Sequence, residues 1–254
     1  MSFVPAREVP ADPPWNRWRG FVPFATVSAV HVTARFVAAD DVAGPTKLAL
    51  MPLLAGAALW TLRGRKVDGA SALLLGALTF SGIGDGAGAF FPHAPEVPVM
   101  IAAFGVAHLC WIRLLSKHAA PGPLPRWAVL FPVWWAGMLA ALWPSLGSLA
   151  AAVALYGVVL GGTAATAARC GPLVAAGGLL FLASDTVLAF RIFNPGAMPG
   201  WTSALVMLTY CAGQGLMVAG YLRRRARRRP APAAEPAPAR RGLLARLRRP
   251  AASS

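Results

Sequence analysis

The sequence predicts an all-α, polytopic membrane protein with eight transmembrane helices and both termini in the cytoplasm. Three observations carry this prediction: the scarcity of charge, the length of the apolar segments, and the alternation of basic and non-basic loops. The chain has 254 residues, of which 57% are hydrophobic and only 13% are charged. A soluble domain carries about 25% charged residues, so this chain has too few charges to cover a surface that faces water.

Eight apolar segments are each long enough to cross a bilayer, which takes about 17–25 residues in a helix. They are Phe21–Ala39, Gly44–Leu62, Gly69–Phe91, Val97–Leu115, Arg126–Trp143, Leu146–Ala168, Pro172–Phe193 and Trp201–Leu222. The first resembles a signal peptide, but its long N-terminal flank contains Glu8 and Asp12, and further segments follow it. We therefore expect residues 1–20 to be a cytoplasmic N-terminal segment and residues 21–222 to form the transmembrane domain.

The charges in the connecting segments alternate along the whole chain. Lysine or arginine precedes the first segment and follows the second, fourth, sixth and eighth segments. The loops after the first, third, fifth and seventh segments contain neither lysine nor arginine. Because cytoplasmic loops carry an excess of basic residues, this pattern places both termini on the cytoplasmic side. An odd number of helices would break the alternation.

Residues 223–254 form a basic tail. Between Arg223 and Arg249 the tail has eleven arginines against one acid, Glu235, and so holds most of the net charge of +15. Its stretch "PAPAAEPAPARR" predicts disorder. A basic segment beside a membrane helix favours contact with anionic lipid head groups. The absence of interleaved aromatic residues argues against nucleic acid as a partner.

An internal echo links the third and seventh segments. "GDGAGAF" from Gly84 recurs as "SDTVLAF" from Ser184, which aligns Asp85 with Asp185. Both segments are predicted to run in the same direction, and this suggests a 4+4 parallel repeat. At 1.5 Å per residue, the two aspartates lie about 24 Å and about 20 Å into their segments. We expect both in the outer half of the hydrocarbon region, at similar depth.

A charge at the bilayer centre costs about 2.5–3.5 kcal/mol, so two retained aspartates indicate a function or a network that fixes helix packing. Further polar residues inside the segments, Lys47, His108 and Gln214, could converge with them on a cavity that opens outward, and Tyr210 lies one helical turn before Gln214. A lysine near a helix end can instead snorkel to the interface, and the others can bridge helices. For His31 and Arg35 in the first segment, a structural role is favoured.

Five stretches occur in the order and spacing of a known family. They are "TKLALMPLL", "GALTFSGIGD", "FGVAHLCW", "GGLLFLASDTVLAF" and "YCAGQGLMVAG". From Ala25 to Tyr221 the chain resembles the YhhN family, whose characterised animal members hydrolyse the vinyl ether bond of lysoplasmalogens. Two departures stand out. Trp111 occupies a position where a tyrosine is common in the family, and Leu48 occupies one where many members have a proline.

The resemblance implies that Asp85 and Asp185 are an acid–base pair that acts on a lysophospholipid. The family's lysine, histidine and glutamine fall on Lys47, His108 and Gln214. We expect these residues and Tyr210 to bind the substrate or tune the pair. No cofactor is expected, and the absence of closely spaced His and Asp residues argues against a metal. Two alternatives stay open: a transporter or lipid-binding protein that uses the same cavity, and a scaffold whose tail binds anionic lipid. The bias towards alanine, arginine, proline and glycine indicates a GC-rich bacterial genome, hence the bacterial cytoplasmic membrane. No oligomeric state is predicted.

Overall fold

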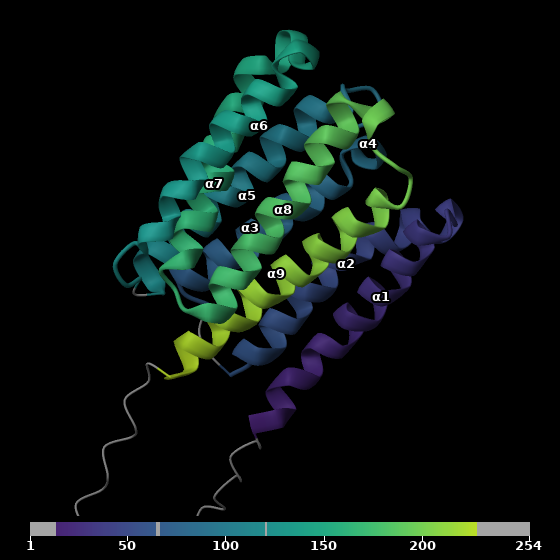
Figure 1. Cartoon of the computed structure of the whole chain (residues 1–254). Helices are drawn as coiled ribbons and strands as arrows, with labels where there is room; N and C mark the ends of the chain where they lie inside the picture. The colour runs from purple at the N-terminus through teal and green to yellow at the C-terminus, as the bar shows by residue number, and fades with distance from the viewer. Residues whose placement is uncertain (1–13, 65–66, 120, 228–254) are drawn as a thin grey trace, which may run out of the picture.

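The chain folds into a bundle of helices, with α1 at one edge and α6 at the opposite edge (Figure 1). The computed structural model describes residues 14–64, 67–119 and 121–227, and all regular secondary structure in these ranges is helical. The α-helices are α1 (Val22–Phe36), α2 (Asp40–Leu62), α3 (Gly69–Asp85), α4 (Ala87–Phe90), α5 (Glu96–His118), α6 (Leu130–Leu146), α7 (Ala150–Ala168), α8 (Pro172–Phe193) and α9 (Thr202–Arg227). Short 3-10 helices are η1 (Pro14–Phe21), η2 (Arg126–Val129), η3 (Gly147–Leu149) and η4 (Pro195–Ala197). The predictions for residues 1–13 and 228–254 lie outside the described residues.

Five helical stretches in the described ranges are long and apolar enough to cross a membrane, as the multi-pass prediction requires. They are Asp40–Leu62, Glu96–His118, Arg126–Ala168, Pro172–Phe193 and Thr202–Arg227. Two other helices fall short in length: α3 is apolar but has 17 residues, and α1 has 15. A helix the length of α1 measures about 22 Å, against about 30 Å for the hydrocarbon core.

The predicted third helix, Gly69–Phe91, is wrong as a single helix, because α3 ends at Asp85 and α4 begins at Ala87. Glycine costs about 1 kcal/mol relative to alanine inside a helix, and this stretch has four closely spaced glycines. At Gly86, a side chain would also collide with the ring of Phe90. The break therefore falls directly after the carboxylate that the sequence singled out.

The stretch from Arg126 to Ala168 is a hairpin of two antiparallel helices, α6 and α7. Gly147 has a φ of +51°, a conformation that glycine adopts readily, and the chain reverses there. Trp135 on α6 donates its indole N–H to the carbonyl of Ala154 on α7 at 3.0 Å. Further from the turn, Trp134 lies beside Gly161. This pairing places Trp143 and the turn at the same end of the bundle as α4 (Figure 1).

Both ends of the described chain lie at one end of the bundle, which we call the basic end. There, Arg225 on α9 forms an ion pair with Asp68, the residue before α3, at 2.8 Å. Arg224 donates to the carbonyl of Ala119, directly after α5, at 3.1 Å. The 3-10 helix η1 packs against the end of α2. The connections from α1 to α2 and from α8 to α9 lie at the opposite end.

Helices α8 and α9 approach so closely that their backbones touch. A Cβ atom added at Gly177 would lie 2.7 Å from the backbone nitrogen of Met217 and 2.8 Å from the carbonyl oxygen of Gly213. One added at Gly213 would lie 2.9 Å from the backbone nitrogen of Phe181. Such close contact between helices inside a membrane requires small residues.

We therefore expect Gly177→Ala to lower the free energy of unfolding by about 1–3 kcal/mol, because backbone cannot yield as a side chain can. The matched control is Gly105→Ala on α5, where nothing lies within 4 Å of an added Cβ atom. Thermal unfolding of both variants in detergent measures the difference. Equal midpoints for the two variants would contradict the close packing of α8 on α9.

Candidate active site

The two predicted aspartates come from different helices and meet in the interior of the bundle. Asp85 is the last residue of α3, and Asp185 lies in the second half of α8. Each is only 8% exposed, and the two carboxylates lie within electrostatic range of each other. Each accepts a hydrogen bond from a tyrosine: Tyr210 on α9 donates to Asp85, and Tyr156 on α7 donates to Asp185.

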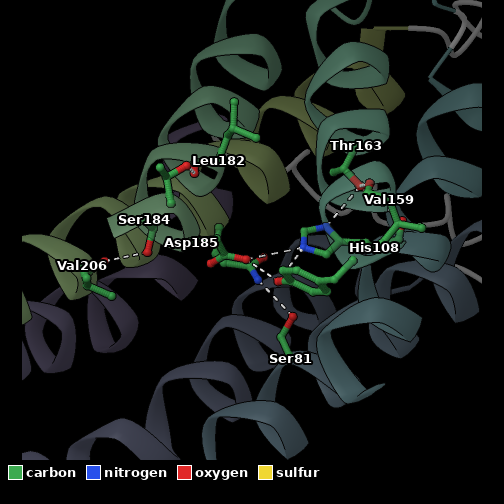
Figure 2. Close-up of polar contacts among 11 residues, drawn as sticks. Ser81, His108, Val159, Thr163, Leu182, Ser184, Asp185 and Val206 are labelled. Carbon is green, nitrogen blue, oxygen red and sulfur yellow. Dashed lines mark hydrogen bonds and ion pairs between the residues drawn. The ribbon is translucent and has the colours of Figure 1, made fainter. Parts of the chain in front are cut away.

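The carboxylate of Asp185 ends a chain of polar groups that includes the predicted histidine (Figure 2). Tyr156 donates its hydroxyl to Oδ2 of Asp185. Nε2 of His108 lies 3.2 Å from that hydroxyl and 3.8 Å from Oδ2 of Asp185. Nδ1 of His108 lies 3.1 Å from Oγ1 of Thr163, on the side away from the carboxylate.

Both ring nitrogens of His108 face hydroxyl oxygens. The hydroxyl proton of Thr163 is donated to the carbonyl of Val159 at 3.0 Å, and that of Tyr156 is donated to Asp185. In this arrangement each hydroxyl oxygen can accept a proton from the ring, and rotation of either hydroxyl makes it a donor to the ring instead. His108 is thus placed to exchange protons with Tyr156 and, through Tyr156, with Asp185.

The carboxylate of Asp85 is held by a second set of contacts between α3 and α9. The hydroxyl of Tyr210 donates to Oδ2 of Asp85 at 2.7 Å. A second contact lies one turn before Asp85 on α3 and one turn after Tyr210 on α9. There, the side-chain N–H of Gln214 donates to Oγ of Ser81 at 3.0 Å. The predicted substrate-binding residue Gln214 is fully buried in this helix contact. These pairs position Asp85 rigidly against α9.

An apolar groove leads to Asp185 between α5, α7 and α8. It is narrow, with a cavity volume of about 40 Å³. Asp185 and Tyr156 are the polar side chains in its wall, and its apolar wall includes Met100, Ile101, Phe104, Val153, Leu188 and Ile192. A groove of this composition suits an alkyl chain, with the reacting atoms at its carboxylate end.

The predicted residue Lys47 does not line this groove. It lies half-buried on α2, in the wall of a second, polar chamber at the opposite end from the basic end. Within the described ranges it forms neither an ion pair nor a hydrogen bond, although it lies within electrostatic range of Asp85. Arg35 and Arg191 line the same chamber.

Tyr156 and Thr163 are site residues that the sequence interpretation missed. The signal for Tyr156 was its rarity, because the whole chain has three tyrosines and all lie in apolar segments. Trp111, at the position where the family often has a tyrosine, is fully buried. The phenol beside His108 instead comes from α7, which runs in the same direction as α5 and lies against it.

Comparison with known proteins gives one match. The sequence profile of the YhhN family matches residues 43–221, which is well over half of the chain. Every residue of the two carboxylate networks falls inside this range, whereas α1 with His31 and Arg35 falls outside it. No curated protein and no solved structure matches the chain.

Proposed function

Because the chain belongs to the YhhN family, we propose that it is a membrane-embedded hydrolase of lysoplasmalogen-type lipids. It would cleave the vinyl ether bond to give a fatty aldehyde and a glycerophospho-head group. The observation that carries the proposal is the pair of buried carboxylates, Asp85 and Asp185, one of which ends an apolar groove. Two carboxylates in different surroundings suit a reaction that passes through an oxocarbenium ion.

The reaction begins with transfer of a proton to the outer alkene carbon of the vinyl ether. The alkene electrons form the new C–H bond, and the carbon next to oxygen becomes an oxocarbenium ion. Water adds to that carbon and loses a proton, giving a hemiacetal. The hemiacetal then releases the head-group oxygen as a hydroxyl and leaves an aldehyde. The sum is addition of one water, with no oxidant or reductant.

Asp185 is the general acid in this scheme, because it lies in the groove wall where an alkenyl chain would bind. Tyr156 holds the carboxyl oriented through its hydrogen bond. The hydroxyl of Tyr156 and Nε2 of His108, which lie 3.2 Å apart, can relay the proton that the attacking water loses. Proton return to Asp185 then restores the site.

Asp85 acts as the anionic partner in this proposal. It lies within electrostatic range of Asp185, is held by Tyr210, and lies within electrostatic range of the cation Lys47. A fixed negative charge stabilises the oxocarbenium ion without needing to reorganise during the reaction. The two aspartates thus have different roles because only one of them lines the groove.

We further propose that the chain crosses the membrane eight times, with the basic end in the cytoplasm. Short connections join α2 to α3 and α8 to α9, and the helices of each pair pack side by side, so they run in opposite directions. The arginines of the basic end match the positive-inside rule. The 4+4 repeat rests on the sequence echo that aligns Asp85 on α3 with Asp185 on α8.

The proposed location is the bacterial cytoplasmic membrane, and the proposed partners are a lysophospholipid substrate and anionic lipids at the basic end. The composition of the chain supports the bacterial cytoplasmic membrane as the location. Arg223, Arg224 and Arg227 support the anionic lipids as partners, because they line a pocket of about 260 Å³ at the end of α9. Arginine clusters at this level attract anionic head groups.

A transporter is the second candidate, favoured by the charged chamber around Lys47 beside buried carboxylates. The decisive experiment uses purified protein in detergent with a 1-alkenyl lysophosphoethanolamine. We expect fatty aldehyde and glycerophosphoethanolamine in equal amounts, and no product from the 1-alkyl analogue, which has no alkene to protonate. Well-folded protein that forms no aldehyde, but takes up the lipid or an ion in proteoliposomes, would establish the transporter instead.

A further inference from the structure

We propose that the polar chamber between α1, α2, α8 and α9 binds the glycerophosphate head group of the substrate. In this assignment, Lys47 and Arg191 bind the phosphate, and His31 accepts a hydrogen bond from a glycerol hydroxyl. The assignment rests on the proposed hydrolase and adds residues of α1 and α8 to its site. The chamber has a cavity volume of about 370 Å³, which is ample for a glycerophosphate group.

The charges in the chamber favour an anion. Of the cations in its wall, Arg35 is already neutralised by Asp40, with a contact of 2.8 Å. Arg191 donates to neutral groups, the carbonyl of Pro199 and the hydroxyl of Thr202. In the described part of the chain, neither Arg191 nor Lys47 forms an ion pair. Two positive charges thus face the chamber without a paired acid, which suits a phosphodiester.

Helix dipoles explain the arginines but not the lysine. Arg35 and Arg191 lie in the last turns of α1 and α8, where the helix dipole favours a cation. Lys47 lies two turns into α2, beyond the terminal turns in which a helix dipole acts. Its half-buried charge therefore needs another source of stabilisation. Asp85 supplies part of it, and a bound anion would supply the rest.

His31, in the wall of the chamber, has a buried ring nitrogen without a hydrogen-bond partner among the described residues. Its Nδ1 lies 2.9 Å from Oγ1 of Thr46, whose own proton is donated to the carbonyl of Val42 at 2.6 Å. Nδ1 is therefore the donor, and Nε2 carries a lone pair. His31 is 1% exposed, and Nε2 has no partner among the described residues. A lysolipid has a free glycerol hydroxyl that can donate to this nitrogen.

The chamber and the groove share one wall residue on α8. Leu188 lines both, and Asp185 lies one turn before it, on the groove side. Arg191 lies one turn after it, on the chamber side. A lipid with its chain in the groove and its phosphate in the chamber would place the vinyl ether bond near Leu188, beside Asp185. In the substrate, only the glycerol backbone separates the vinyl ether bond from the phosphate.

The test measures binding of glycerophosphoethanolamine and, separately, of inorganic phosphate to the full-length protein by calorimetry. We expect Lys47→Gln and Arg191→Gln each to weaken binding of glycerophosphoethanolamine by about tenfold, or about 1.4 kcal/mol. The matched control Lys117→Gln, which removes an exposed lysine from the other end of the bundle, should keep the wild-type Kd. His31→Phe should weaken the binding of glycerophosphoethanolamine but leave the binding of phosphate unchanged.

Several outcomes would overturn the assignment. The assignment is wrong if the wild-type protein does not bind glycerophosphoethanolamine. It is also wrong if Lys47→Gln and Arg191→Gln both bind it with the wild-type Kd. Phosphate binding that exceeds glycerophosphoethanolamine binding would indicate a site for the free ion instead. If one variant does not fold, the other decides. The binding assay needs no turnover, so its outcome can be separated from that of the hydrolysis assay. Protein that binds glycerophosphoethanolamine but does not hydrolyse the vinyl ether would refute only the proposed hydrolase function. Protein that hydrolyses the vinyl ether but does not bind glycerophosphoethanolamine would refute only the assignment of the chamber as the head-group site.

Discussion

Asp185→Asn should lower kcat for aldehyde release by about 10²–10⁴-fold, the range for loss of a general acid. The amide is nearly the same size as the carboxyl and can still accept the hydrogen bond from Tyr156, so the fold should persist. It cannot donate an acidic proton to carbon. The measurement is single-turnover aldehyde formation at saturating substrate.

The matched control is Asp41→Asn, the same change at an exposed position in the first turn of α2. It should retain wild-type kcat. Asp85→Asn should reduce kcat less than Asp185→Asn does, because Asp85 does not line the groove but still stabilises the cation. Equal and full activity of both Asp85→Asn and Asp185→Asn would refute the carboxylate pair.

Tyr156→Phe should lower kcat by about 10–100-fold and change the pH dependence of kcat. The variant removes the donor to Asp185 and breaks the connection from that carboxyl to His108. A buried polar group left without its partner costs about 1–3 kcal/mol, so part of the loss will be structural. The pH profile separates the two effects, because a merely structural role lowers kcat equally at every pH.

Tyr221→Phe is the matched control for this change. Tyr221 is also buried on the bundle interior, but it lies eleven residues beyond Tyr210, or about 16 Å along α9. We expect the kcat and the pH profile of Tyr221→Phe to match those of the wild-type enzyme. A Tyr156→Phe enzyme with an unchanged profile would show that His108 and Tyr156 take no part in proton transfer.

The predictable part of this molecule was the part that hydropathy and charge determine. Apolar length predicted where the helices lie, and rare intramembrane charge singled out Asp85, Asp185 and His108, which the structure brings together. The echo between Asp85 and Asp185 predicted a common depth. The apolar segments and the rare charges within them follow from the free-energy cost of charge in lipid, and this cost acts on each residue separately.

The parts that needed the structure depend on contacts between distant helices. Nothing local to Tyr156 shows that it reaches Asp185, because that depends on how α7 packs against α5 and α8. The helix break after Asp85 depends on Gly86 and on the ring of Phe90 in the next turn. Lys47 and Gln214 were expected in one cavity with the aspartates, yet one faces the polar chamber and the other binds Ser81.

The most direct test of the central claim is hydrolysis of a 1-alkenyl lysophosphoethanolamine in D₂O, with mass spectrometry of the aldehyde. Protonation of the outer alkene carbon predicts one deuterium on the carbon next to the aldehyde group. It also predicts slower turnover than in H₂O, because the proton from Asp185 moves in the slow step. Aldehyde without that deuterium, or folded wild-type protein that forms no aldehyde, would contradict the account.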